Sequence, residues 1–92
     1  MEDIRSGIYR HFKGGYVLVL FTAKHSDRDE VEVVYKGLNN GKYYARPVPS
    51  FVDMVTNEAG ESVPRFTLAE LHEITEFMMD VDVQNMLNLF KD

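Results

Sequence analysis

The chain of 92 residues is the size of one domain, and ten Lys and Arg against fifteen Asp and Glu give it a net charge of -5. An acidic chain is a poor candidate for coating bare DNA or an anionic membrane, where cationic side chains supply the affinity. The absence of cysteine excludes disulfides, thiolate catalysis and sulfur-ligated metals. The start resembles no secretory signal and no apolar run could span a bilayer, so we expect a small cytoplasmic protein with no membrane partner.

Turn signals divide the first two-thirds of the chain into short segments. Gly14-Gly15 predicts a tight hairpin, and Asn39-Asn40-Gly41 predicts a type I′ turn with positive φ at both central positions. Between these and similar breaks lie short runs rich in aromatic and β-branched residues, which are typical of strands. The predicted strands are 8–12, 16–22, 31–36, 43–48, 51–56 and 62–66. Five or six such strands without an intervening helix pattern predict a small antiparallel barrel.

The net charge is confined to the last quarter of the chain. Residues 1–66 carry nine basic and nine acidic side chains, whereas residues 67–92 carry one lysine and six acids. This change in composition predicts two structural units within one domain: a barrel over 1–66 and an acidic tail over 67–92.

The tail has the pattern of amphipathic helix. Thr67 and Glu70 form a predicted capping box, and Asp80 and Asp82 are expected to interrupt the helix, which gives one helix or two. The apolar residues at helical spacing are Leu71, Ile74, Met78, Met86, Leu87 and Phe90. Because short isolated helices are marginal in water, this stripe should pack on the barrel or on a second subunit, as in a homodimer.

Arg10 is the most unusual residue of the first strand. With Ile8 and Phe12 taken as the core face, Arg10 would point inward, where an unpaired cation is very costly. It is therefore expected either to pair with a carboxylate, such as Glu30 or Asp53, or to receive an anion.

Other arginines and aromatic residues suggest a binding face. Tyr44 and Arg46 should project from the same strand face, as a packing pair or as half of a stacking platform for a planar ligand. Arg65 lies among apolar residues, and the three arginines could converge on one concave face. The candidate ligand-binding residues are Tyr9, Arg10, His11, His25, Tyr44, Arg46 and Arg65. No spacing typical of metal ligands occurs, so we expect no metal and no cofactor.

Several motifs together resemble a known family. They are Gly7-Ile8-Tyr9-Arg10-His11-Phe12-Lys13-Gly14, Ala23-Lys24-His25-Ser26, Val33-Val34-Tyr35, Arg46-Pro47 with Phe51, and Val63-Pro64-Arg65-Phe66. Over residues 7–66 the chain resembles the bacterial domain of unknown function 1653. The resemblance implies an SH3-like β-barrel in a bacterial cytoplasmic protein and implies no activity. Residues 67–92 lie outside the family pattern.

These observations predict a mainly β protein with a C-terminal helical tail: a small antiparallel SH3-like barrel with one or two amphipathic helices. We expect a non-enzymatic binding module, whose ligand could be a peptide, a small anion or nucleic acid. The alternative is a structural, oligomerisation or adaptor protein that acts through its C-terminal helices. A minor alternative is an enzyme with His25 or His11 as general base.

Overall fold

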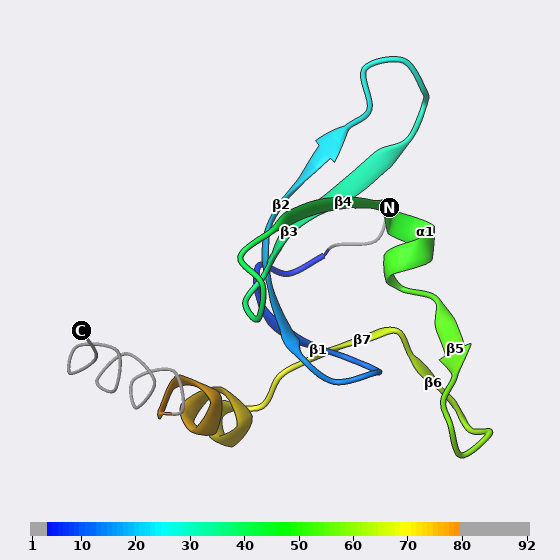
Figure 1. Ribbon diagram of the computed structural model, residues 1–92. Coiled ribbons are helices and arrows are strands. Elements are labelled where there is room, and N and C mark those ends of the chain that lie inside the picture. Colours follow the sequence, from blue (N-terminus) through cyan, green and yellow to red (C-terminus); the bar gives the residue numbers. More distant parts are fainter. Residues whose placement is uncertain (1–3, 80–92) are drawn as a thin grey trace.

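The structure, a computed structural model, describes residues 4–79, which form mainly antiparallel β-structure (Figure 1). In chain order the elements are β1 (Gly7–His11), β2 (Tyr16–Lys24), β3 (Val31–Gly37), β4 (Tyr43–Pro47), α1 (Val48–Phe51), β5 (Met54–Thr56), β6 (Ser62–Pro64) and β7 (Phe66–Leu68). A second helix begins at residue 71 and is described as far as residue 79. The predicted mainly β fold and four of the predicted hairpin strands, β1 to β4, are confirmed.

The strands form two antiparallel sheets rather than a closed barrel. The larger sheet has the order β4-β3-β2-β1-β7, and β5 pairs only with β6. Within the described residues β4 and β7 are therefore edges, so the expected SH3-like closure is not confirmed. The chain leaves the sheet at Pro47, which has no N–H to donate to a ladder, and turns into α1 instead of continuing as a strand.

Helix α1 was not expected, because Pro47 and Pro49 indicate only where a strand stops. In the structure Pro47 is the N-cap residue and Pro49 lies in the first turn, where a missing N–H removes no helical hydrogen bond. The single turn places Val48 and Phe51 in the core. The predicted strand 51–56 is therefore reduced to β5.

Both predicted glycine turns occur, with one difference in geometry. Gly14 and Gly15 have φ of 97° and 83° between β1 and β2. In the β3–β4 turn only Gly41 has positive φ, at 73°, so the predicted type I′ turn is wrong. Side-chain bonds hold this turn: the N–H of Tyr16 donates to Asn39 Oδ1 over 2.9 Å, and that of Lys42 to Asn40 Oδ1 over 3.0 Å.

The core lies on one face of the curved sheet. Val19 and Val33 are 1% and 0% exposed, and Val33 and Tyr35 both face the core because alternate residues of a strand share a face. The other core residues are Tyr9, Val17, Val48, Phe51 and Phe66. Phe51 of α1 stacks on Phe66 of β7 with ring centroids 4.4 Å apart and an interplanar angle of 8°. This stack joins α1 to the sheet, and its Phe66 ring also lines the site described below.

The helix over residues 71–79 lies on the opposite side of the sheet from α1 (Figure 1). Its Phe77 ring lies 5.0 Å from that of Tyr16, and Glu73 forms an ion pair with Arg10. The predicted capping box is wrong, because Thr67 belongs to β7. That strand pairs with β1 and so runs two residues past the predicted boundary at residue 66.

The predicted apolar stripe of this helix is largely exposed. Leu71 and Met78 are 79% and 56% exposed, and Ile74 is half-buried. Leu71 and Met78 thus bury little surface within the described residues, and the packing of this stripe on the sheet or on a second subunit stays a prediction. Met86, Leu87 and Phe90, and with them the question of one helix or two, lie outside the described residues. Within 4–79, no helix has the length and apolar character that crossing a membrane demands.

Candidate functional site

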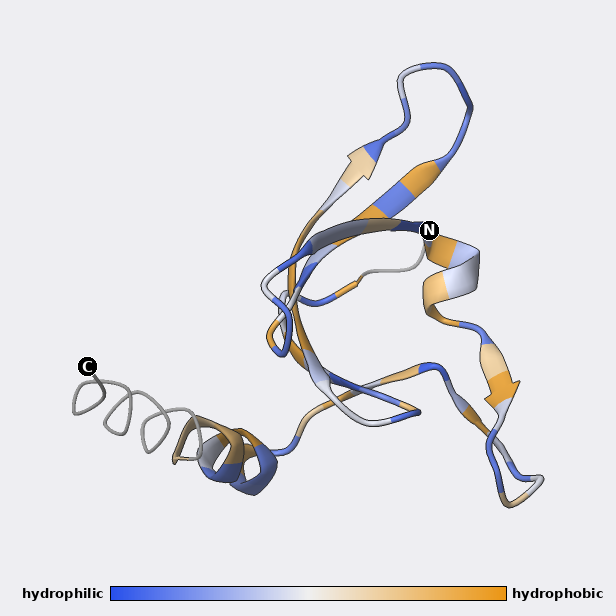
Figure 2. Cartoon of the chain, viewed as in Figure 1, coloured by the Kyte–Doolittle hydropathy of each residue, from blue (hydrophilic) through white to orange (hydrophobic). Residues whose placement is uncertain are grey.

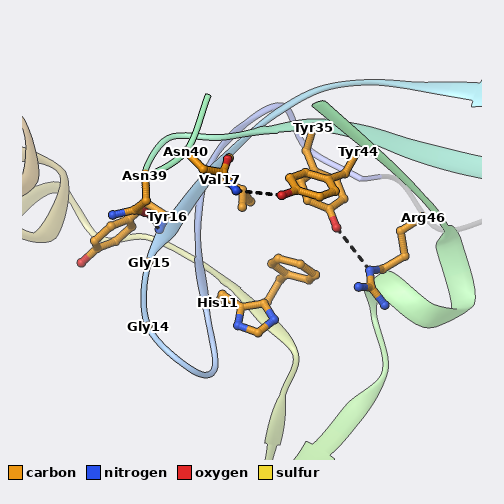
Figure 3. A pocket seen from close by; sticks show the side chains of 12 residues that line it. His11, Gly14, Gly15, Tyr16, Val17, Tyr35, Asn39, Asn40, Tyr44 and Arg46 are labelled. Atoms are coloured by element: carbon orange, nitrogen blue, oxygen red, sulfur yellow. Dashed lines mark hydrogen bonds between the residues drawn. The ribbon is translucent and has the colours of Figure 1, made fainter. Parts of the chain in front are cut away.

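A pocket of about 320 Å³ opens where the β1–β2 turn, the β3–β4 turn and β7 meet (Figure 3). A volume of this size is at the lower end for small-molecule sites in proteins. Its lining residues are His11, Gly14, Gly15, Tyr16, Val17, Tyr35, Gly37, Asn39, Asn40, Tyr44, Arg46 and Phe66.

Aromatic rings form the walls of this pocket, and strand register explains their positions. Tyr35 and Tyr44 are partners across β3 and β4, and their rings stack 5.4 Å apart at 23°. His11 and Phe66 are partners across β1 and β7, and their rings meet edge to face at 5.1 Å. The Phe66 ring also meets Tyr35 at 5.4 Å. The pocket thus has apolar, planar surfaces on more than one side.

Arg46 lies at one end of the pocket, on β4. Its Nε donates to the Tyr35 hydroxyl over 3.3 Å, and its Nη1 donates to Ser50 Oγ over 2.9 Å. The guanidinium carbon lies 5.9 Å from the centre of the Phe66 ring. Among residues 4–79 no carboxylate oxygen lies within 4.0 Å of this side chain. Arg46 is therefore a half-buried cation that two hydrogen bonds fix in place, and it has no counter-charge in the described part of the chain.

His11 is a neutral hydrogen-bond donor at neutral pH. The N–H of Lys13 donates to its Nδ1 over 3.1 Å, which assigns the proton of the neutral ring to Nε2. Burial, with the charges of Arg46, Arg65 and Lys13, lowers the pKa of His11 below its usual value of 6.5. The ring therefore adds a donor to the lining without adding a charge.

Four of the predicted ligand-binding residues come together here. His11, Tyr44 and Arg46 line the pocket, and the prediction that Tyr44 and Arg46 share a strand face agrees with this geometry. Arg65 lies beside them, because its Nε donates over 3.1 Å to the carbonyl of Ser50, the residue whose hydroxyl Arg46 also binds. The Nη2 of Arg65 is 4.0 Å from a carboxylate oxygen of Asp53.

Tyr9 and Arg10 lie elsewhere, because the core face of β1 is the opposite of the one expected. Tyr9 packs edge to face on Phe51, and its hydroxyl donates to the carbonyl of Arg5 over 2.8 Å; burial raises the pKa of Tyr9. Arg10 points to the other face, where it pairs with Glu73. The predicted alternatives of Glu30 or Asp53 as its partner are wrong, and the three arginines do not converge.

His25 lies at the far end of the β2–β3 hairpin, in a hydrophilic loop (Figure 2). Its Nδ1 accepts hydrogen bonds from the backbone N–H groups of Asp27 and Arg28 over 3.1 and 3.2 Å, and the backbone N–H of His25 donates to the carbonyl of Glu30. These bonds shape the turn, and the residue is not part of the pocket lining.

Most lining residues were not predicted as ligand-binding from the sequence. Tyr35 was noted only as part of a strand and of a family motif, and Asn39 and Asn40 only as turn residues. The pocket exists because the β3–β4 turn lies beside the β1–β2 turn, and the signal that could have suggested it is the pair of amides next to glycine-rich turns. Within residues 4–79, no three His, Asp or Glu side chains gather in a way that could hold a metal ion.

The fold and the site define a small, open antiparallel β domain with an arginine-bearing aromatic pocket. Its sequence matches the family described as Protein of unknown function (DUF1653) over residues 7–68, and the chain belongs to that family. The predicted resemblance is thereby confirmed.

One solved structure supports the same relationship. A crystal structure of a protein of this family from Bordetella bronchiseptica is similar to this chain with a TM-score of 0.67 and 36% sequence identity. The similarity covers 75% of this chain and 91% of that one. No curated protein matches the sequence.

Proposed function

We propose that this chain is a non-enzymatic binding module whose ligand occupies the pocket around Arg46. The observation that carries the proposal is the state of that side chain. Two neutral groups, the hydroxyls of Tyr35 and Ser50, hold the guanidinium in place, and no carboxylate among residues 4–79 neutralises it. Burying a cation without a counter-charge is unfavourable for folding. A fixed, unpaired cation in an aromatic pocket is therefore better explained by ligand binding than by a purely structural role.

The other two half-buried arginines support this assignment by contrast. Arg10 has Glu73 as its partner, and Arg65 lies near Asp53, as expected for structural cations. Within the described residues His11 faces no carboxylate in the pocket lining that could orient it as a general base. This supports binding over catalysis as the role of the pocket.

Chemical-shift mapping tests the proposal directly. A panel of single-ring compounds, some anionic, some neutral and some cationic, is titrated into ¹⁵N-labelled full-length protein. We expect shifts concentrated on the amides of Gly14, Gly15 and Asn39, with loss of these shifts in Arg46→Met. Arg28→Met is the matched control, because it removes the same charge from the exposed β2–β3 loop. A panel in which no compound shifts these amides would refute the proposal.

The exposed helix favours homodimerisation as a second candidate function. Leu71, Met78 and Met79 are 79%, 56% and 62% exposed on a helix whose other face already contacts the sheet. We propose a second copy of the chain as the partner of this surface. Light scattering should show a dimer for the full chain and a monomer for the double variant Leu71→Glu, Met78→Glu. A full chain that stays monomeric at high concentration contradicts this candidate.

A further inference from the structure

The hydrogen-bonding groups of the pocket are almost all donors. No aspartate or glutamate is among its lining residues, although the chain contains fifteen. The two amide oxygens that could accept are occupied by the backbone: Asn39 Oδ1 accepts from Tyr16, and Asn40 Oδ1 accepts from Lys42. A ligand that offers donors or a positive charge finds no free carboxylate here.

Besides the amide groups of Asn39 and Asn40, four lining side chains carry unused donors. A guanidinium has five N–H groups, and the two bonds of Arg46 to Tyr35 and Ser50 leave three of them. The Tyr35 hydroxyl accepts from Arg46, so its own proton remains to be donated. The Tyr44 hydroxyl accepts from Asn40 Nδ2 over 2.7 Å and likewise keeps its proton. The Nε2–H of His11 completes the set. These donors are complementary to an anion with several acceptor atoms.

The rest of the lining favours a flat, apolar body on that anion. The rings of Tyr35 and Tyr44 stack on each other, while the Phe66 ring meets both Tyr35 and His11 edge to face. Rings arranged in this way gain energy from an offset or edge contact with a further ring. The volume of about 320 Å³ limits the body to a small one.

The charge of the protein favours a ligand with a single anionic group over a polyanion such as nucleic acid. Nucleic-acid binding draws most of its affinity from several cations along the phosphate backbone. The chain has a net charge of -5, and Arg46 is the one Lys or Arg of the pocket lining, as far as the structure describes it. The planar fork of a guanidinium matches a carboxylate with two parallel hydrogen bonds.

We propose that the pocket binds a small aromatic carboxylate, with the carboxylate on Arg46 and the ring among Tyr44, Tyr35 and Phe66. This inference rests on the proposed function and names the ligand class of the same site.

The test compares matched probes on the full-length wild-type protein, with the amide shifts of Gly15 and Asn39 as the readout. Benzoate carries the ring and the charge, benzamide the ring without the charge, and acetate the charge without the ring. We expect benzoate to bind at least about tenfold more tightly than benzamide, which lacks the charge-assisted hydrogen bonds, and than acetate, which lacks the ring contacts. Arg46→Lys, which keeps the charge but not the fork, should weaken benzoate several-fold, and Arg28→Met should leave it unchanged.

Each other outcome has a definite meaning. Equal binding of benzamide and benzoate at these amides overturns the carboxylate assignment but leaves the binding module intact. Tighter binding of adenosine monophosphate or inorganic phosphate than of benzoate overturns it in favour of a phosphate group. The absence of any shift in the pocket with every probe, including the neutral and cationic rings, overturns the proposed function as well. The comparison of benzoate with benzamide uses only the wild type, so it stands even if Arg46→Lys fails to fold.

Discussion

Two neighbouring valines on β3 give a test of the one-sided core. Val33 is 0% exposed on the concave face of the sheet, the face that packs against α1, whereas Val34 lies on the opposite, convex face and is half-buried (Figure 1). Val33→Ala removes two buried methyl groups, at about 0.8 kcal/mol each, and leaves a cavity, so it should lower the free energy of unfolding by about 2–3 kcal/mol. Val34→Ala loses about half of the transfer contribution and leaves no closed cavity, so about 1 kcal/mol is expected.

Because both changes lie in the same strand, the loss of β-propensity is nearly the same and cancels in the comparison. Urea unfolding at 25 °C, followed by far-UV circular dichroism, measures both free energies and checks that the m-value is unchanged. The difference of about 1.5 kcal/mol corresponds to roughly 6–12 °C in Tm for a domain of this size. Equal losses for Val33→Ala and Val34→Ala would mean that both faces of the sheet are packed alike, which would refute the assignment of the core to the concave face.

Three further predictions concern the site and its surroundings. The pKa of His11 is lower in the folded than in the unfolded chain, so below about pH 6.5 the unfolded chain binds a proton more readily and stability falls. Between pH 7 and pH 5 the Tm of the wild type should therefore decrease more than that of His11→Gln. Arg10→Met leaves the Glu73 carboxylate, whose side chain is only 17% exposed, without its cation. Hydrogen exchange of amides 74–79 should therefore speed up by an amount equivalent to about 1 kcal/mol, and adding Glu73→Leu should restore it. Gly37→Ala places a methyl group against Asn40 Oδ1, so urea unfolding should show a loss of about 1–3 kcal/mol, and the amide shift of Lys42 should move.

The local pattern of the sequence is enough to predict most of the sheet. Alternate residues of a strand share a face, and this period of two is enough to place Tyr44 and Arg46 on one face of β4. Gly14-Gly15 and Gly41 indicate the hairpins because positive φ is inexpensive only for glycine. The parts predicted correctly thus depend on contacts between neighbouring strands.

The wrong predictions concern strands with apolar residues on both faces and contacts between residues that are distant in sequence. In β1 the face with Ile8 and Phe12 is as apolar as the face with Tyr9, and Tyr9 packs on Phe51 of α1, a contact that is distant in sequence. The partner of Arg10, Glu73, lies on the helix after the sheet, so no local pattern indicates it.

The pairing of β7 with β1 also determines when the pocket can form. Strands β1 to β4 follow one another as hairpins, whose short loops close at little entropic cost. By contrast, His11 meets Phe66 only after almost the whole sheet region has been synthesised and the intervening loop has closed. Such non-local pairings slow folding, because the loop entropy is lost before the contact is gained. A nascent chain can therefore hold β1 to β4 as a hairpin meander with Tyr35, Tyr44 and Arg46 in register, while the pocket is completed only when β7 brings in Phe66.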